Sequence, residues 1–212
     1  MSQHFIVYTL PPPGISSFTK IRLGWITRDQ MEFVMPGNTR FVSLSPLSRR
    51  GDTLTIKIPL SSGRYYLIEN RQPVGFDTVL PDSGILILKV NPRVQEGSGT
   101  VRVMNANAAV PYFSQATFRL DRREGNIFVD KKNDVAVIPL WSDGENQNLL
   151  ITTQAQSADA LKSALLIQKI MDRYPKPRTR RQDQLIKKCI GIFKSYDFKT
   201  CGQLAKDIFK EK

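Results

Sequence analysis

The spacing of apolar residues changes once along this chain, near residue 153. Up to that point the apolar residues form short alternating or continuous runs separated by turn residues, which is typical of strands. Beyond it they recur at intervals of three and four, which is typical of amphipathic helices. The runs predict nine strands, at residues 40–44, 53–60, 65–69, 85–90, 100–104, 116–120, 127–129, 135–140 and 149–152.

Many short strands with frequent turn signals are typical of two antiparallel sheets that pack face to face. We therefore predict a mainly β fold, an antiparallel β-sandwich-like module with a three-helix C-terminal appendage. A short helix is expected before the module, at residues 18–23, where Gly24 would stop it.

The appendage is predicted from three amphipathic stripes. The first helix is expected to begin at Ser157 as its N-cap and to end before Pro175. A basic linker at residues 175–181 leads to a second helix at residues 182–193. The third helix is expected to begin with the capping box of residues 200–203, because the Thr and Gln side chains there can satisfy exposed amides.

The chain is organised around residues 64–91, where two predicted strands flank a loop rich in proline and glycine. Glu69, Asn70, Arg71 and Asp77 lie at the end of the first strand and in this loop. Because an unpaired buried charge is costly, we predict that these residues form a structural, ion-paired network that fixes the loop. The alternatives are contact with a missing catalytic segment, or calcium.

A second group of oxygen-bearing side chains follows a later strand. Asp130, Asn133 and Asp134 supply possible ligands, though not at the spacing of an EF-hand loop. An Asn-Asp turn explains the same residues without a metal. Calcium is therefore possible here, and no other cofactor is predicted for the chain itself.

The central region also carries a family resemblance. It resembles the segment after the zinc site in immune-inhibitor-A-like metallopeptidases, through YYLIENRQPVGFD at residues 65–77 and LPDSGILILKV at residues 80–90. Flanking parts of the family are similar to ISSFTKIRLGWI at residues 15–26 and, in archaeal members, to VRVMNANAAVPYFSQATFRL at residues 101–120. The resemblance covers roughly residues 1–152.

The resemblance implies that this chain is the C-terminal, post-catalytic part of such a peptidase, without its HExxH half. Residues 1–27 would be the remnant of the catalytic-domain end, residues 28–153 the antiparallel β domain, and residues 157–212 a basic helical appendage. It also implies zinc in full-length relatives. Met1 and Ser2 fall where the family has a methionine turn, so the chain is expected to begin inside a longer protein.

One family motif departs from its usual residues in this chain. Where relatives read GLLIWHVD, residues 84–91 read GILILKVN. Leu88, Lys89 and Asn91 replace the family's Trp, His and Asp. Any role of that His-Asp pair therefore has no counterpart here.

The residues present do not provide a catalytic site. A zinc peptidase of this type needs two histidines at HExxH spacing and a third ligand, whereas this chain has one histidine, His4. A Ser-His-Asp or Cys-His site would also have to use His4. We therefore predict that the isolated chain is inactive. Cys189 and Cys201 fall on apolar helical stripes, which predicts buried packing residues, with a disulfide between the last two helices as the alternative.

Charge adds a second functional hypothesis. The formal net charge is +12, and residues 157–212 hold 14 Lys and Arg against 6 Asp and Glu, a charge of +8. Such a segment can contact an anionic polymer, either nucleic acid or cell-surface material, and a solvated face is the alternative. The predicted basic patch consists of Arg173, Lys176, Arg178, Arg180, Arg181, Lys187 and Lys188.

These features predict a non-catalytic β module that supports proteolysis only if a zinc-binding half is supplied elsewhere. The alternative is a stand-alone binding module whose basic helices contact an anionic polymer. The partner is expected to be the missing catalytic segment or another protein. No apolar run approaches the ~18 residues that span a bilayer, and residues 1–10 lack the basic start of a signal peptide. The expected localisation is secreted or cell-surface by resemblance, and cytoplasmic if the short form is real.

Overall fold

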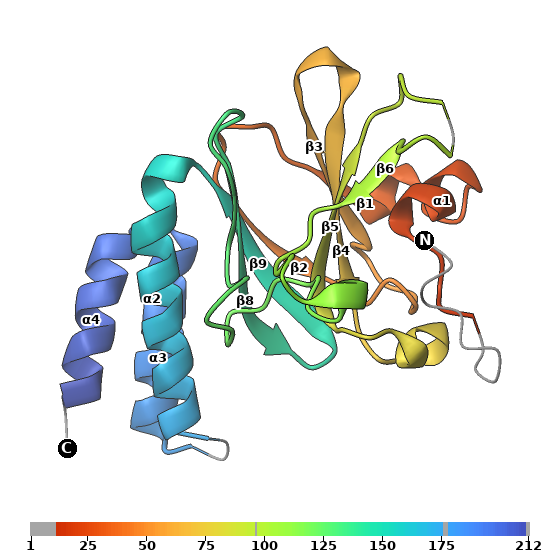
Figure 1. The fold of residues 1–212 in the computed structure, drawn as a ribbon. Helices are drawn as coiled ribbons and strands as arrows, with labels where there is room; N and C mark the ends of the chain where they lie inside the picture. Colours follow the sequence, from red (N-terminus) through yellow and green to blue (C-terminus); the bar gives the residue numbers. More distant parts are fainter. Residues whose placement is uncertain (1–11, 96, 176–177, 211–212) are drawn as a thin grey trace.

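Two β-sheets lie between a short N-terminal helix and a layer of C-terminal helices in the computed structural model, which describes residues 12–95, 97–175 and 178–210 (Figure 1). The first sheet has strand order β1-β3-β4-β5-β6, formed by β1 Met31–Phe33, β3 Thr55–Pro59, β4 Tyr65–Arg71, β5 Gly84–Val90 and β6 Val101–Val103. The second has order β2-β9-β8-β7, formed by β2 Arg40–Leu44, β9 Asn146–Thr152, β8 Val135–Asp143 and β7 Phe128–Asp130.

The two sheets enclose a shared apolar core. Alternation along β3 sends Ile56 and Ile58 into this core, while Lys57 between them points to the outer face. From the facing sheet, Leu44 and Ile151 enter the same core. Strands β3, β4 and β9 therefore send alternate residues into this core, the period of two that a face-to-face packing of sheets requires.

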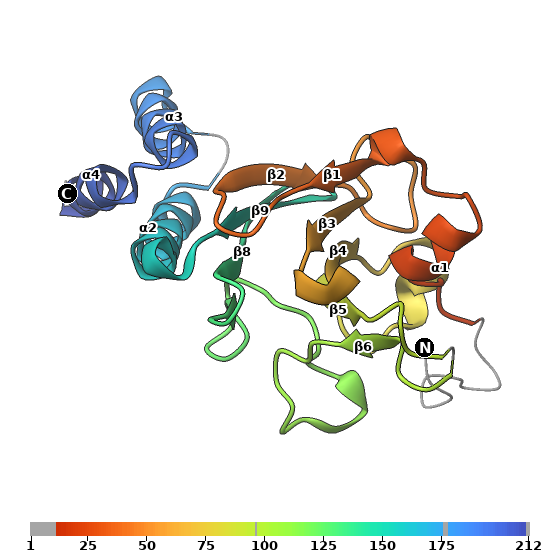
Figure 2. The ribbon, with the colours of Figure 1, turned by 90° about the horizontal axis from the view of Figure 1, so that it is seen from above.

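Three helices cover the outer face of the four-stranded sheet (Figures 1 and 2). They are α2 Gln154–Arg173, α3 Arg180–Lys194 and α4 Phe198–Lys210. Because the helices bury this face, β8 is buried continuously over its first seven residues instead of alternating. The apolar side chains of β8 that share a core with the helices are Ile138, Leu140 and Trp141.

The opposite end of the molecule is covered by a much smaller helix. Helix α1, Ser17–Arg22, lies on the outer face of the five-stranded sheet, where Phe18 and Ile21 pack against Leu67 and Leu88. In the connections of the described ranges lie four short 3₁₀ helices: η2 Arg28–Gln30, η3 Ser61–Gly63, η4 Gly75–Val79 and η5 Pro111–Phe113. Among the helices of the described ranges, none is long and apolar enough to cross a membrane.

The predicted fold class is wrong. The structure is mixed α/β, with 36% of residues in helices and 26% in strands, so a mainly β antiparallel module does not describe it. The five-stranded sheet is mixed, because β1 runs parallel to β3. The predicted strand at residues 116–120 does not form, and Phe118 makes only an isolated bridge to Ile85. Helix also extends further than predicted at both ends of the second stripe, since α3 spans Arg180–Lys194.

Two predicted helix starts are wrong for a shared reason. Thr153, not Ser157, is the N-cap of α2, since its side chain accepts a hydrogen bond from the Gln156 amide. Helix α4 begins at Phe198, and the Thr200 amide donates to the Asp197 carboxylate at 3.1 Å. In both cases a polar residue nearer the N-terminus satisfies the first free amides. The predicted division at residues 27 and 153–157 stays a prediction.

Candidate functional site

The alternation of β4 decides where the predicted network residues point. Glu69 and Arg71 face the outer side of the five-stranded sheet, while Asn70 between them faces the second sheet. All three side chains are fully buried, and so is Asp77 on the following 3₁₀ helix. Buried charges at these positions need partners, because their desolvation is otherwise uncompensated.

Arg71 bridges the two carboxylates. Its Nη2 donates to Asp77 Oδ1 at 2.7 Å, and its Nη1 donates to Glu69 Oε1 at 3.3 Å. The same guanidinium donates to the backbone carbonyls of Gly14, at 2.7 Å, and Ile15, at 3.3 Å. A planar guanidinium suits this role, because its fixed fork of donors serves several acceptors at once.

The carboxylates bind the same N-terminal segment from the other side. Glu69 Oε2 accepts from the Ser17 amide at 2.7 Å, and Asp77 Oδ1 accepts from the Gly14 amide at 3.1 Å. A Cβ on Gly14 would lie 2.6 Å from Asp77 Oδ1, so only glycine allows this close approach. We call Glu69, Arg71, Asp77 and the backbone of residues 14–17 the clasp, because they fasten the chain before α1 onto the central sheet.

The electrostatics of the clasp follow from two carboxylates sharing one guanidinium. Burial raises the pKa of Asp77, and the Glu69 charge adds to this rise, although Arg71 opposes it. The second oxygen of Asp77 and the Nε of Arg71 find no hydrogen-bond partner within the described residues. Lys20 lies close by, and burial followed by repulsion from Arg71 lowers its pKa. The clasp is therefore a buried structural site, without an exposed acid or base for a substrate.

Asn70 has a different task from its neighbours. Its amide Nδ2 donates to the Leu44 carbonyl at 3.0 Å and to the Glu145 carbonyl at 3.2 Å. The backbone carbonyl of Asn70 accepts a hydrogen bond from the Leu47 amide at 2.9 Å. Its side-chain Oδ1 accepts one from Gln72, also at 2.9 Å. Asn70 therefore ties the five-stranded sheet to β2 and to the β8–β9 turn. The four predicted residues thus do not form one cluster: three build the clasp and Asn70 joins the sheets.

A further ion pair, which is partly buried and joins Asp82 to Arg122, was not predicted from the sequence. Asp82, in the turn before β5, binds Arg122 through two bonds of 2.6 and 3.1 Å. Its Oδ2 also accepts from the amide and the hydroxyl of Thr117, at 2.9 and 2.8 Å. Gly84 adopts φ +136°, where a Cβ would meet Thr117, so the turn cannot carry a side chain there. The PDSG turn was the available signal, but its partner lies 40 residues away.

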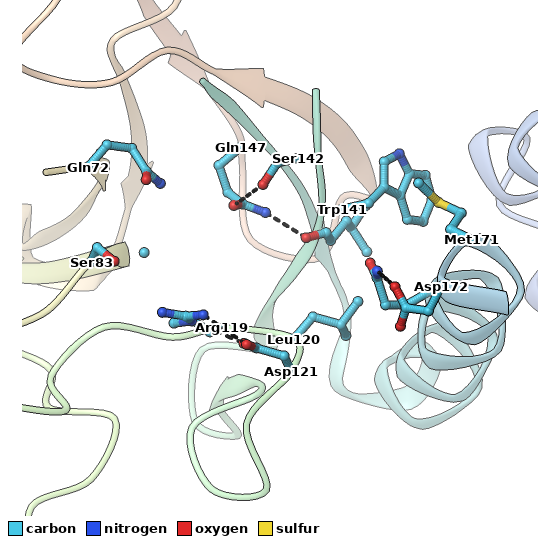
Figure 3. Close-up of a pocket in the computed structure, with 13 residues that line it drawn as sticks. Gln72, Ser83, Arg119, Leu120, Asp121, Trp141, Ser142, Gln147, Met171 and Asp172 are labelled. Atoms are coloured by element: carbon cyan, nitrogen blue, oxygen red, sulfur yellow. Dashed lines mark hydrogen bonds and ion pairs between the residues drawn. The ribbon is translucent and has the colours of Figure 1, made fainter. Parts of the chain in front are cut away.

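A polar pocket of about 560 Å³ opens where the five-stranded sheet, the β8–β9 hairpin and α2 meet (Figure 3). Arg119 and Asp121 form an ion pair at 2.8 Å on one wall, and hydrogen bonding to Arg119 lowers the pKa of Asp121. Gln168 donates to Asp172 at 2.7 Å on the opposite wall. Ser142 donates to Gln147 between these walls, so three pairs of lining residues are hydrogen-bonded to each other (Figure 3). The described residues that line this pocket include no histidine, cysteine or lysine.

The residues present do not fit the zinc site that the resemblance implies for full-length relatives. Within the described ranges no group of three or more His, Cys, Asp or Glu is placed to hold a metal ion. The single histidine, His4, and the Met1–Ser2 motif lie outside those ranges. We therefore derive no catalytic step through zinc for this chain.

The turn considered for calcium is held by hydrogen bonds. Asp130 accepts from the hydroxyl of Tyr66 at 2.7 Å and from Asn133, which lowers its pKa despite partial burial. Asp134 accepts from the amide of Gln154 at 2.8 Å, at the start of α2. These contacts give each carboxylate a structural role in the turn. Calcium binding at this turn stays a prediction.

The two cysteines are free and buried. The thiol of Cys201 donates to the Cys189 carbonyl, with the sulfur 3.4 Å from the oxygen. Burial raises the pKa of Cys189 to about 11 and that of Cys201 to about 12. The alternative of a disulfide is therefore wrong, and both thiols are inert packing groups.

The predicted basic patch is divided among different roles. Arg178 is nearly buried and donates to the Tyr174 carbonyl at the end of α2, where it serves as a C-terminal cap. Lys187 pairs with Asp183 at 2.8 Å. The exposed members are Arg173, Arg180, Arg181, Lys187 and Lys188, whereas Lys176 lies outside the described ranges.

Comparison with known proteins does not add to this picture. No protein-family model, no curated protein and no solved structure matches the chain.

Proposed function

We propose that this chain is a non-catalytic support module of the metallopeptidase-like type, which assists proteolysis only when a zinc-binding half is supplied elsewhere. The observation that carries the proposal is the clasp. Its three charged side chains are fully buried and bind the backbone of residues 14–17. Such an arrangement fixes the path of the chain onto the central sheet, and burial keeps these carboxylates from a substrate in solvent.

The ENRQ sequence at residues 69–72, which is part of the resemblance, supplies two of the charged side chains of the clasp. Glu69 and Arg71 hold the segment before α1, and Asn70 joins the two sheets. A motif whose side chains are used in this way is expected to serve as a rigid base for a neighbouring catalytic part. Among the described residues that line the polar pocket at α2, no nucleophile is paired with a base, so they do not favour a catalytic alternative.

The test measures zinc content and peptide hydrolysis by the purified chain. We expect substoichiometric zinc and no cleavage that a chelator inhibits. The DNA beside this coding sequence is then searched for an HExxH segment, which is expressed and added. Chelator-sensitive hydrolysis that requires both polypeptides supports the proposal, and hydrolysis by this chain alone overturns it.

A second candidate function is contact with an anionic polymer through α3. Arg180, Lys187 and Lys194 are exposed and recur every seven residues, about 10 Å apart along one side of the helix. The test is salt-dependent retention on immobilised heparin. The variant Arg180→Glu/Lys194→Glu should lose most of the retention, while a charge reversal on β6 of the other sheet, Arg102→Glu, should lose little.

A further inference from the structure

Exposed apolar side chains concentrate in one short part of the described chain. Leu23, Trp25, Phe33 and Met35 are 53%, 63%, 37% and 56% exposed, and they account for most of the large apolar residues left open to solvent. Leu23 and Trp25 follow α1, Phe33 is the last residue of β1, and Met35 comes two residues after it. Clusters of this kind, unlike scattered exposed residues, mark interaction surfaces.

The local structure holds these side chains outward. Ile26 is buried in a small core with Leu47 and Leu54, so the preceding Trp25 projects to solvent. Val34 enters the main core between the sheets, and alternation therefore exposes Phe33 and Met35 on either side of it. The exposed residues are fixed by buried neighbours, so the apolar surface exists before any partner binds.

Cations and rings connect the two halves of this surface. Arg28 lies 3.6 Å above the Phe33 ring, and Lys57 lies 5.8 Å from the same ring and 4.2 Å from the ring of Tyr65. Burial raises the pKa of Tyr65, and the nearby charge of Arg22 opposes this rise. Arg22 therefore lies close to the ring of Tyr65. We call the surface formed by Leu23, Trp25, Phe33, Met35, Arg22, Arg28 and Lys57 the Trp25 face.

The charge of this face limits the choice of partner. A second copy would bring three cations against three cations, in a chain whose net charge is already +12. Single-stranded nucleic acid would need several open rings for stacking, but Arg28 and Lys57 cover Phe33 and Tyr65, so among these three rings only Trp25 is open. Asp29 beside Arg28 adds one negative charge, since hydrogen bonding to Thr27 lowers its pKa, but the three cations outnumber it. An anionic, apolar partner therefore fits best.

We propose that the Trp25 face docks on the surface of an anionic lipid membrane. Leu23, Trp25, Phe33 and Met35 enter the headgroup region, and Arg22, Arg28 and Lys57 contact lipid phosphates. Tryptophan at the interface with cations beside it is the combination that interfacial binding uses. This inference goes beyond the proposed support function and does not depend on it.

The experiment uses the full chain and vesicles of phosphatidylglycerol mixed with phosphatidylcholine, with phosphatidylcholine alone for comparison. We expect co-sedimentation with the anionic vesicles, weakened by salt. Brominated lipid should quench Trp25 and leave buried Trp141 unaffected, so Trp25→Phe should bind but lose the quenching. Leu23→Ser/Trp25→Ser should bind roughly tenfold more weakly, because two large apolar groups leave the lipid.

Matched variants make the result decisive. Phe76→Ser removes an equally exposed aromatic residue, 65% open, outside the Trp25 face and should bind as the parent does. Arg180→Glu/Lys194→Glu on α3 should also leave binding largely intact. Absence of binding to anionic vesicles overturns the proposal. Loss only in the α3 variant, or equal loss in Phe76→Ser, overturns it too, as does binding restricted to a single-stranded oligonucleotide.

Discussion

The chain segments on the two outer surfaces of the sheet pair are held by different kinds of contact. On the five-stranded sheet, the segment before α1 is held by buried charges and hydrogen bonds of the clasp. On the four-stranded sheet, α2, α3 and α4 are held by apolar side chains and two neutral thiols. The clasp holds the irregular backbone of residues 14–16 and the first amide of α1, whereas the C-terminal helices satisfy their own backbone groups and need only an apolar face.

This difference explains why each region has its composition. An irregular segment lying on a sheet exposes amides and carbonyls that would remain unpaired if the sheet offered only apolar side chains. Glu69, Arg71 and Asp77 supply the missing donors and acceptors. We therefore expect the clasp to be sensitive to the loss of any single partner, and the helical layer to respond to lost volume.

The largest effect is expected from Arg71→Met. The change leaves Glu69 and Asp77 buried without their shared cation and removes two donors from the backbone of residues 14–15. Losing one member of a buried ion pair costs roughly 3–5 kcal/mol. Urea unfolding, followed by circular dichroism, measures the loss.

A combined variant shows whether the cost comes from charge or from shape. Glu69→Gln/Arg71→Met/Asp77→Asn removes all three charges, and it should be more stable than Arg71→Met alone. The exposed pair of Arg49 and Glu145 provides the control, because Arg49→Met should change stability by less than about 1 kcal/mol. A triple variant that is less stable than the single one would refute the charge explanation.

The next effect belongs to the helical layer. Phe193 is fully buried between Trp141 and Phe198, with ring centroids 5.6 and 5.1 Å away. Phe193→Ala should cost about 3 kcal/mol through lost contacts and the cavity left behind. Because helices and sheet share this core, thiol reaction of Cys189 and Cys201 should begin at the same urea concentration as loss of the sheet signal. Thiols that react well before the sheet unfolds would show that the helical layer is independent.

The helical layer and the clasp also differ in how much of each could be predicted from the sequence. The helical layer was predicted to within a few residues. A helical period shows itself over short sequence distances, as in Ile186, Cys189 and Phe193, which are three and four positions apart. The charged residues of the clasp were predicted to pair, since Glu69, Arg71 and Asp77 lie close together. Their backbone partners were not predicted, because residues 14–17 lie more than 50 positions away.

The mixed sheet was missed for a related reason. Strand β1 has only three residues, Met31–Phe33, too few to show a period, and its parallel pairing with β3 depends on the tertiary path of the chain. The predicted strand at residues 116–120 had the right composition, yet Asp82 and Arg122 hold that segment beside β5 without a ladder. The polar pocket joins five separate segments, and no local pattern marks it.

A smaller effect is expected at the junction of the sheets. Asn70→Ala leaves the carbonyls of Leu44 and Glu145 without their donor. Since the side chain is fully buried, the loss should be about 2 kcal/mol. Asn70→Asp is the matched variant, and it should be worse, because it buries a charge against two carbonyl oxygens. Unfolding in urea separates the two, and equal stability of both variants would contradict the assigned bonds.

The smallest effect concerns pH and isolates Asp77 within the clasp. Its pKa is raised above the ordinary 3.8, with burial as the main cause, so the folded chain holds a proton there that the unfolded chain has already released. Between the two pKa values, stability therefore falls as pH rises. Asp77→Asn keeps an oxygen acceptor for Arg71 and Gly14 but has no proton to exchange. The free energy of unfolding of this variant should fall less steeply with pH across the acidic range above pH 3.8. The reason is that the parent binds up to one more proton when folded than when unfolded in that range, and the variant does not. A steeper fall than in the parent would mean that the charge of Arg71 outweighs burial at this carboxyl group.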